Sequence, residues 1–538
     1  MDWNFATLWE SVRDSLPERV AIVQGDRRRT WSEFDDRAAR LAAALCAGGL
    51  EPNAKVASYL YNGNEYLEGL YATFKMRGVA VNVNYRYLED ELVYLLDNSD
   101  AEALFFHSSL GGRVAKIRDR APLVKLWIEV EDGGEHQEFA ARYEDLIETN
   151  EPMPRIERSG EDLYFLYTGG TTGMPKGVMW RFDDLWGVLS DATYALVGQT
   201  PPERPDGVGP LAAQILDSGR DTAHLPASPL MHGTGAFTSF QSIWAGGRIV
   251  TLEGRHFDPD ELWRVVGRER ITQMAIVGDA FAKPMLKALE AAEARGEPYD
   301  LSSLQLMISS GVMWSAEIKQ GLMARGNFLC FDSLGSSEGV GFANSISAPG
   351  AEQATAKFSI GPQARVFKDD GAEVVPGSGE VGLLAVGGNI PVGYYKDDAK
   401  SAATFLLIND ERWSVPGDFA SVEADGTIVL LGRGSVVINS GGEKIYPEEV
   451  EEAIKRHPAV ADCLVVGVPD DRFGEAVTAV VELAADTEAS GDEITAALDG
   501  LSRFKHPRHY VFVPSVLRAP NGKADYKWAK QTATAGVG

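Results

Sequence analysis

The sequence predicts an α/β protein: a large multi-layered α/β domain at the N-terminal end and a small, mobile α+β domain at the C-terminal end. Three observations support this prediction. The chain has 538 residues, helical and strand patterns alternate early in it, and the pattern beyond Val450 is self-contained. A chain of this length can form a large core and still carry an appended domain.

The early alternation is clearest in four consecutive segments. Apolar residues follow helical spacing from Trp31 to Ala47 and again from Glu65 to Met76, whereas Lys55 to Tyr61 and Val79 to Val83 have strand patterns. Alternation of this kind is typical of helices packed on a sheet.

Further along, Leu301 to Ser310 and Asn327 to Leu334 are predicted as buried strands that run into small polar residues. Ligands of parallel α/β sheets bind where strands end in such loops. Pro201 to Gly219, rich in proline and glycine, is predicted as a long exposed loop.

The C-terminal pattern begins with a helix from Pro447 to Lys455, whose first turn carries proline and glutamates, as the helix dipole favours. The elements predicted after it are strands at Ala459 to Val468 and Ala476 to Leu483, a helix at Glu493 to Leu501, a strand near Tyr510 and a frayed tail. We therefore assign residues 1–431 to an N-terminal domain, 432–436 to a hinge and 437–538 to a C-terminal lid domain.

Composition and charge exclude several classes of protein. The net charge of -27 argues against a nucleic-acid-binding surface. The three cysteines, Cys46, Cys330 and Cys463, have no CxxC spacing, so neither a disulfide framework nor a zinc site is predicted. No secretory signal or membrane-spanning segment is recognisable, and we expect a cytoplasmic protein.

The segment YFLYTGGTTGMPKGVMW is the most informative one for chemistry. Its glycines allow a tight turn that directs backbone N–H groups at an anion, and its hydroxyls and lysine add donors and positive charge. The residues predicted to bind phosphate are Thr168, Gly169, Gly170, Thr171, Thr172, Gly173 and Lys176.

This segment differs from the Walker A loop of P-loop kinases and ATPases. Pro175 stands where Walker A has its second glycine, and Gly177 stands where it has Ser or Thr. Gly177 and Val178 favour a second strand over a helix. The alternatives left open are a P-loop enzyme and a flexible hairpin with no ligand.

Other segments gain meaning from their order. Seven short motifs follow the loop along the chain, in this order: SPLMHG, SSG, LGSSE, WSVPGD, GRGS, SGGEKIYP and PNGK. Each is a weak signal alone; a single histidine such as His232 is more often part of a core, and Asp418 could simply form a turn.

Together and in this order these motifs resemble those of the adenylate-forming superfamily, which comprises acyl-CoA synthetases, adenylation domains and luciferases. The resemblance covers nearly the whole chain. GGEKIYPEEVE and NVNYRYLEDELVYLL look closest to synthetases that act on fatty or steroid side-chain acids. The resemblance implies an ATP- and Mg²⁺-dependent acid–thiol ligase that forms an acyl-adenylate and transfers the acyl group to coenzyme A.

The resemblance also implies roles for single residues. Glu338 would hold Mg²⁺, Asp418 would accept hydrogen bonds from the ribose hydroxyls, and Lys523 would bridge the attacking carboxylate and the α-phosphate. His232 is a further candidate catalytic residue. Besides the loop, the candidate nucleotide contacts are Ser310, Gly311, Gly335, Ser336, Ser337, Asp418 and Arg433.

For the second half-reaction, the resemblance implies that the small domain turns about Ser435. Gly441, Gly442 and Glu443 would then bind coenzyme A, whose pantetheine arm needs close approach to the backbone. The basic residues Arg503, Lys505, His506 and Arg508 are candidates for its anionic end, and an ordinary solvated loop is an equal alternative.

Three features depart from the family pattern. Ser435 replaces the usual Asp or Lys of the hinge, and Leu334 replaces the tyrosine that stacks on adenine. Small residues after His232 indicate an open acyl tunnel. The remaining alternatives are a carrier-protein acceptor, a luciferase-like oxidative step, an aromatic acid as substrate and a non-catalytic nucleotide-binding protein. The oligomeric state is left open, a homodimer included.

Overall fold

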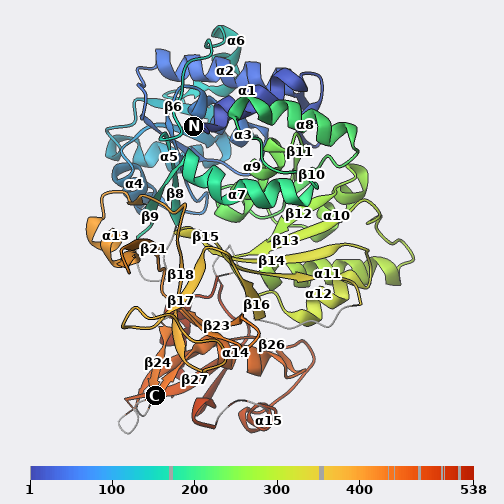
Figure 1. Ribbon diagram of the computed structural model, residues 1–538, viewed down its shortest axis with the longest axis vertical. Coiled ribbons are helices and arrows are strands. Elements are labelled where there is room, and N and C mark those ends of the chain that lie inside the picture. The colour runs from blue at the N-terminus through green and yellow to red at the C-terminus, as the bar shows by residue number, and fades with distance from the viewer. Residues whose placement is uncertain are drawn as a thin grey trace.

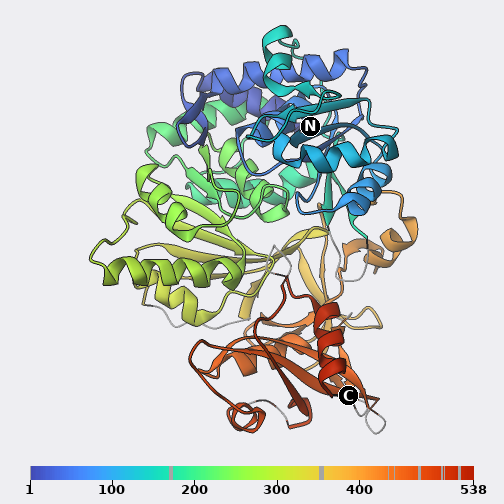
Figure 2. The same cartoon turned by 180° about the vertical axis from the view of Figure 1, so that it is seen from behind.

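The computed structural model describes residues 2–168, 174–350, 357–433, 436–440, 443–470, 474–498, 501, 503–518 and 523–537. Within these ranges the strands form three sheets, and Figure 1 shows helices packed around the first two. The third sheet lies with the C-terminal residues at one end of the molecule, and Figure 2 shows the same arrangement from behind. The predicted α/β class, with a large N-terminal and a small C-terminal part, is confirmed.

The first sheet follows the order β2 (Arg27–Thr30), β1 (Val20–Gln24), β11 (Arg248–Thr251), β10 (Ala223–Pro226), β12 (Gln273–Ile276), β13 (Leu306–Ser310), β14 (Leu329–Ser336), β15 (Gly339–Ser347), β16 (Lys357–Ile360), β23 (Thr427–Arg433), β22 (Asp418–Val422), β18 (Val381–Val386), β21 (Glu411–Ser414) and β20 (Phe405–Ile408), with β17 (Ala364–Phe367) paired to β18.

The second sheet follows the order β19 (Gly393–Tyr394), β9 (Lys176–Arg181), β8 (Leu163–Thr168), β4 (Val79–Asn82), β3 (Lys55–Tyr59), β5 (Ala101–His107), β6 (Leu126–Val130) and β7 (Ala141–Arg142). The third contains β25 (Glu443–Ile445), β24 (Ile438–Ser440), β27 (Gly474–Leu483) and β26 (Val460–Asp470), with β28 (His509–Val513) paired to β27.

The α-helices are α1 (Phe5–Ser15), α2 (Trp31–Ala47), α3 (Asn64–Lys75), α4 (Glu89–Asn98), α5 (Gly111–Ile117), α6 (Tyr143–Thr149), α7 (Phe182–Leu196), α8 (Val208–Asp217), α9 (Gly233–Trp244), α10 (Pro259–Arg268), α11 (Gly278–Ala294), α12 (Ala316–Met323), α13 (Asp398–Thr404), α14 (Pro447–Lys455), α15 (Gly491–Ala496) and α16 (Tyr526–Val537).

Both large sheets change from parallel to antiparallel pairing beside a predicted motif. β13 and β14 run parallel, whereas β14 and β15 run antiparallel. In the second sheet, β4 and β8 run parallel, whereas β8 and β9 run antiparallel. The phosphate loop and the Ser337–Glu338 turn therefore follow the last parallel strand of their respective sheets, at the edge where such sheets bind ligands.

An aromatic cluster positions α9 in the core. Phe5 of α1 packs on Phe182 of α7 at 4.4 Å between ring centroids and on Trp244 of α9 at 4.9 Å. These rings are fully buried. Rings of this size dominate the energetics of a core, so α9 and the histidine before it are firmly held.

Local signals explain the helices that the sequence predicted best. The predicted helix from Trp31 to Ala47 is α2, and it begins with a capping box in which Thr30 and Glu33 bond to each other's backbone N–H groups. The predicted helix from Pro447 to Lys455 is α14, with proline in its first turn.

Two predictions about irregular segments are wrong. Most of Pro201 to Gly219 forms α8, which buries Val208, Ala212 and Ile215 and packs against α1. Gly209 allows this close contact, since a Cβ there would lie 1.9 Å from the Ser11 carbonyl oxygen. The predicted frayed tail is instead the second half of α16, which is held by the buried Ala529 and Ala533.

None of the helices in the described ranges is long and apolar enough to cross a membrane.

Candidate active site

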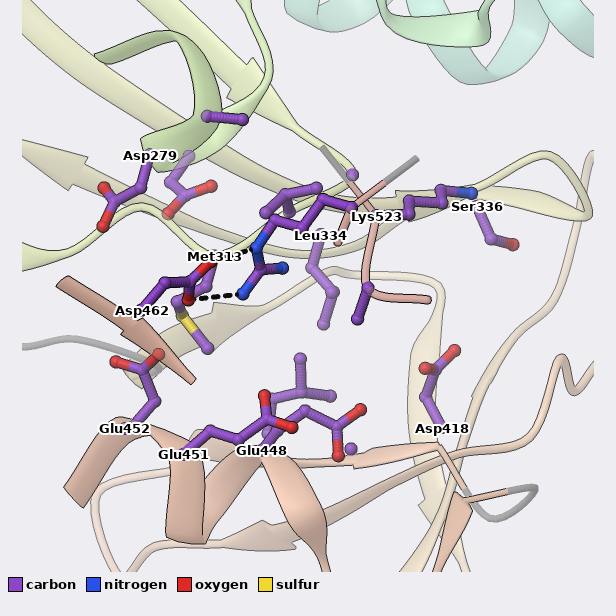
Figure 3. A pocket seen from close by; sticks show the side chains of 18 of the residues that line it. Asp279, Met313, Leu334, Ser336, Asp418, Glu448, Glu451, Glu452, Asp462 and Lys523 are labelled. Carbon is purple, nitrogen blue, oxygen red and sulfur yellow. Dashed lines mark hydrogen bonds and ion pairs between the residues drawn. The ribbon is translucent and has the colours of Figure 1, made fainter. Parts of the chain in front are cut away.

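A cavity of about 580 Å³ lies between the large N-terminal part and the C-terminal residues. It is lined by residues from both. The predicted site residues that it brings together are Thr168, Gly311, Gly335, Ser336, Ser337, Glu338, Asp418 and Lys523. Figure 3 shows Lys523 and Ser336 across the cavity from the carboxylates of α14.

The phosphate loop connects two paired strands. Thr168 ends β8, Lys176 begins β9, and the two residues are cross-strand partners. The predicted strand–loop–strand arrangement is confirmed, and the helix that a Walker A loop requires is replaced by β9. Gly169, Gly170, Thr171, Thr172 and Gly173 lie outside the described residues.

Lys176 is positioned by two groups near the end of the second sheet. Its Nζ lies 2.5 Å from Oδ2 of Asp397 and 5.8 Å from the ring centroid of Tyr394. Asp397 is the N-cap of α13 and accepts a hydrogen bond from the backbone N–H of Lys400. The pKa of Asp397 is lowered, chiefly by its hydrogen bond with Lys176.

Glu338 lies in the turn between β14 and β15, and its backbone and side chain are held separately. The Ser414 hydroxyl donates to the Glu338 carbonyl oxygen at 2.6 Å, and the Trp180 indole donates to the carbonyl of Ser337 at 3.0 Å. The Tyr394 hydroxyl donates to Glu338 Oε1 at 2.7 Å. The carboxylate is therefore oriented before any ligand is present.

Gly311 forms the tight turn after β13. Its φ of +92° suits glycine, and it lines the cavity next to Val312 and Met313. Ser310 ends β13 directly before it, and its Oγ lies 3.9 Å from the position that a Cβ on Gly335 would take. The SSG and LGSS motifs thus meet at the carboxyl ends of two neighbouring parallel strands.

Asp418 and Arg433 occupy opposite positions in the β22–β23 pair. Asp418 is the first residue of β22 and lines the cavity, and Arg433 is the last residue of β23. The side chain of Arg433 lies outside the description. The pairing brings two predicted nucleotide contacts to the same end of one hairpin.

Lys523 reaches the cavity from the C-terminal part. The next residue, Ala524, forms an antiparallel bridge with Arg518. The guanidinium of Arg518 binds the Asp462 carboxylate at 2.5 and 2.8 Å, a bidentate contact drawn in Figure 3. This contact anchors the segment that carries the lysine.

His232 is the N-cap residue of α9, directly before its small first-turn residues. Burial, together with the positive charges of Lys523 and Arg86, lowers its pKa to about 4. It does not line the described cavity. It is thus a neutral imidazole near Lys523, placed at the start of a core helix.

The predicted hinge and coenzyme A residues are placed only in part. Ser435, Gly441 and Gly442 lie outside the described residues, and Glu443 is the first residue of β25, with its side chain outside the description. In the basic segment, Lys505 forms an ion pair with Glu449 at 2.7 Å.

Sequence reasoning missed several residues that the fold brings to the site. Asp332 lines the cavity and accepts a hydrogen bond from the buried Lys319 at 3.1 Å. Burial raises the pKa of Asp332 to about 6, an effect that Lys319 opposes. Tyr394 was missed as well, although it is part of a GYY sequence after a turn. In the position of the family's stacking tyrosine, Leu334 lines the cavity together with Phe358.

Comparison with known proteins agrees with this geometry. Residues 9–395 match the family model for AMP-binding enzymes, and residues 449–523 match that for the AMP-binding enzyme C-terminal domain. The chain is 44% identical to the 3-oxocholest-4-en-26-oate–CoA ligase of Rhodococcus rhodochrous, over 98% of this chain and 96% of that protein.

Two further proteins extend the comparison. The medium/long-chain-fatty-acid–CoA/3-oxocholest-4-en-26-oate–CoA ligase of Mycobacterium tuberculosis is 40% identical, over 98% of this chain and 96% of that protein. The crystal structure of ATP-bound MatB from Rhodopseudomonas palustris superposes with a TM-score of 0.81 and 25% identity, over 99% of each chain. The chain belongs to the family of AMP-binding, adenylate-forming enzymes.

Proposed function

We propose that the protein is an ATP-dependent acid–CoA ligase that activates a hydrophobic carboxylic acid as its acyl-adenylate. The observation that carries the proposal is that Thr168, Ser337, Glu338, Asp418 and Lys523 line the same cavity. These residues come from the two large sheets and the C-terminal part, and they provide donors, two carboxylates and a cation suited to a nucleotide and a second, anionic substrate.

The residues divide the nucleotide between them. Asp418, an acceptor when ionised, would hold the ribose hydroxyls, and the phosphate loop with Lys176 would hold the outer phosphates. Asp332 would accept from the adenine amino group, with Leu334 and Phe358 forming apolar walls. Lys523 would lie between the acid and the α-phosphate, where it offsets the repulsion between two anions.

The site also fits Mg²⁺. The described residues contain no group of three or more His, Cys, Asp or Glu side chains able to hold a metal by themselves. Mg²⁺ bound with a nucleotide needs only one or two carboxylates, because phosphates and water complete its shell. Glu338 would provide the carboxylate, and the ion would neutralise phosphate charge.

The reaction then consists of two successive displacements. A carboxylate oxygen of the acid attacks the α-phosphorus, and pyrophosphate leaves. The thiol sulfur of coenzyme A next attacks the acyl carbon, AMP leaves and the thiol proton is released. His232, which is neutral well below pH 7, would orient the acid rather than carry a charge.

The substrate class follows from the relatives. Those 40–44% identical to the chain over 98% of its length are named for medium- and long-chain fatty acids and for a steroid side-chain acid. We propose the same class here, with coenzyme A as the acceptor and a C-terminal domain that turns about residues 432–436 between the two steps.

Isotope exchange tests the proposal. Acids of each type are supplied with ATP and labelled pyrophosphate, and exchange into ATP is measured before coenzyme A is added. We expect exchange with medium- or long-chain or steroid acids, followed by thioester and AMP when coenzyme A is present. Exchange without formation of a thioester would show that the acyl acceptor is not coenzyme A but another thiol, such as that of a carrier protein. Formation of ADP instead of AMP would refute the proposal.

A further inference from the structure

We propose that Tyr394 is a positioning residue that links the phosphate loop to Glu338, so that the lysine and the carboxylate are oriented as one unit. The inference rests on the proposed function, since it assigns these two groups to a metal–nucleotide substrate. It is carried by the geometry around a strand of two residues, β19, which pairs at the edge of the second sheet.

Backbone bonds attach Tyr394 to the strand that leaves the phosphate loop. Gly393 and Tyr394 pair antiparallel with Met179 and Val178 of β9. The N–H of Tyr395 donates to the carbonyl of Gly177 at 2.8 Å. Tyr394 therefore follows any displacement of β9, whose first residue is Lys176.

The side chain of Tyr394 extends from β19, at the edge of the second sheet, to the turn between β14 and β15 of the first sheet. It is buried, with 4% of its surface exposed, and its hydroxyl donates to Glu338 Oε1 at 2.7 Å. Among the described residues, this hydroxyl is the side-chain group that binds the Glu338 carboxylate. It fixes the rotation of that carboxylate by binding Oε1.

The ring of Tyr394 contacts the other charged group. Its centroid lies 5.8 Å from Lys176 Nζ, which also pairs with Asp397. Asp397 belongs to the same short connection as Tyr394, and Ser401 joins them by accepting from the Tyr394 N–H at 2.8 Å and donating to the Asp397 carbonyl at 2.8 Å. The short connection from Tyr394 to Ser401 therefore contacts both Lys176 and Glu338, the cation and the anion that we assign to the metal–nucleotide site.

This arrangement matters because Mg²⁺ requires nearly octahedral geometry, so the direction of its carboxylate ligand is important. A hydrogen bond to a metal-binding carboxylate orients it in advance, and loss of such a bond typically weakens metal binding by 10- to 100-fold. We therefore expect Tyr394 to act on metal–nucleotide affinity, without contact to the reacting atoms.

The chain offers a matched control in the next residue. The Tyr395 hydroxyl donates to Asp100 at 2.8 Å, so it also binds a carboxylate, but Asp100, unlike Glu338, does not line the cavity. Tyr394→Phe and Tyr395→Phe each remove one hydroxyl and keep the ring. Melting temperatures of both variants show whether either change affects the fold.

The primary measurement is Mn²⁺ binding by electron paramagnetic resonance, with full-length protein and an ATP analogue that carries a methylene bridge between the α- and β-phosphates. We expect Tyr394→Phe to weaken Mn²⁺ about tenfold and Tyr395→Phe to leave it unchanged. Pyrophosphate exchange by Tyr394→Phe should recover at high Mg²⁺, and thioester formation from supplied acyl-adenylate should match the wild type.

A double-mutant cycle completes the test. If Tyr394 acts through the carboxylate, Tyr394→Phe has no further effect on Mn²⁺ binding in a Glu338→Gln background. Wild-type affinity in Tyr394→Phe, an equal loss in Tyr395→Phe, or additive effects in the cycle would each overturn the inference. The proposed function alone would be refuted by a different pair of results. In that case Tyr394→Phe weakens Mn²⁺ binding as expected, but none of the acids tested supports pyrophosphate exchange by the wild type.

Discussion

The ammonium group of Lys523 lies close enough to His232 for its charge to act on the imidazole. Burial is the main cause of the low pKa of His232, and the lysine lowers it further. The two residues belong to different parts of the fold: Lys523 lies in the C-terminal part, and His232 lies at the start of α9 in the N-terminal part. The C-terminal part is thus placed with its lysine inside the N-terminal site.

This placement predicts a separation of the two half-reactions. Lys523→Ala should slow acid-dependent pyrophosphate exchange by about 100-fold or more, as expected when one oriented charge is lost from a transition state. Thioester formation from supplied acyl-adenylate should stay close to the wild-type rate. Lys530→Ala, which removes an exposed lysine paired with Glu475, is the control. Equal losses in both steps would contradict a lysine that acts in the first step only.

The pKa of His232 predicts a pH dependence of stability. A histidine binds protons below its ordinary pKa of 6.5 in the unfolded chain, but only below about 4 in the folded protein. The unfolded state therefore binds more protons between these values, and the free energy of unfolding falls as the pH drops from 7 to 5, by about 2 kcal/mol for this group. Urea unfolding of wild type and His232→Asn at both pH values isolates this effect; equal pH dependence in the two proteins would contradict it.

Asp332 predicts a pH dependence of nucleotide binding. Because burial raises its pKa to about 6, the carboxyl gains a proton as the pH falls from 7 to 5 and accepts hydrogen bonds less well. The KM for ATP should therefore rise over this range in the wild type. In Asp332→Asn it should be raised already at pH 7 and change less with pH. If the KM of the wild type for ATP does not change from pH 7 to pH 5, Asp332 does not take part in nucleotide binding.

Asp397 predicts the opposite effect on ATP. The ion pair with Asp397 neutralises Lys176, and a phosphate has to compete with it. Asp397→Asn keeps a good N-cap for α13 and removes that competition, so the KM for ATP should fall about threefold, the size expected of a partly exposed ion pair. Asp398→Asn, one residue further along, is the control. A higher KM in Asp397→Asn would mean that the carboxylate orients the lysine more than it opposes ATP.

The sequence predicted those features whose signals are local. The α2 and α14 helices carry their own caps and periodicity, and the order of the motifs predicted which residues meet at the cavity. Tyr394 could not be assigned to the site from the sequence. It lies next to Glu338 only because β19 pairs with β9, and no local sequence pattern predicts that pairing. Asp332 is a similar case, since its role depends on Lys319 lying beneath it.

The α8 helix was missed for a different reason. Gly209 and Pro210 indicate a loop, yet Pro210 lies in the first turn, where a helix tolerates proline, and Gly209 is needed for contact with Ser11. Tertiary packing against α1 decides the structure of this segment, and a local pattern does not contain that information.

The Asp418–Arg433 hairpin has a mechanical consequence for the catalytic cycle. β23 ends at Arg433, inside the proposed hinge of residues 432–436. The sugar of the nucleotide would therefore be held next to the point about which the C-terminal domain is proposed to turn. Lys523 belongs to the C-terminal part that would turn, whereas Asp418 belongs to the large N-terminal part. A rotation would thus withdraw the lysine and leave the ribose contact in place, so that the unstable intermediate stays bound as the second substrate enters.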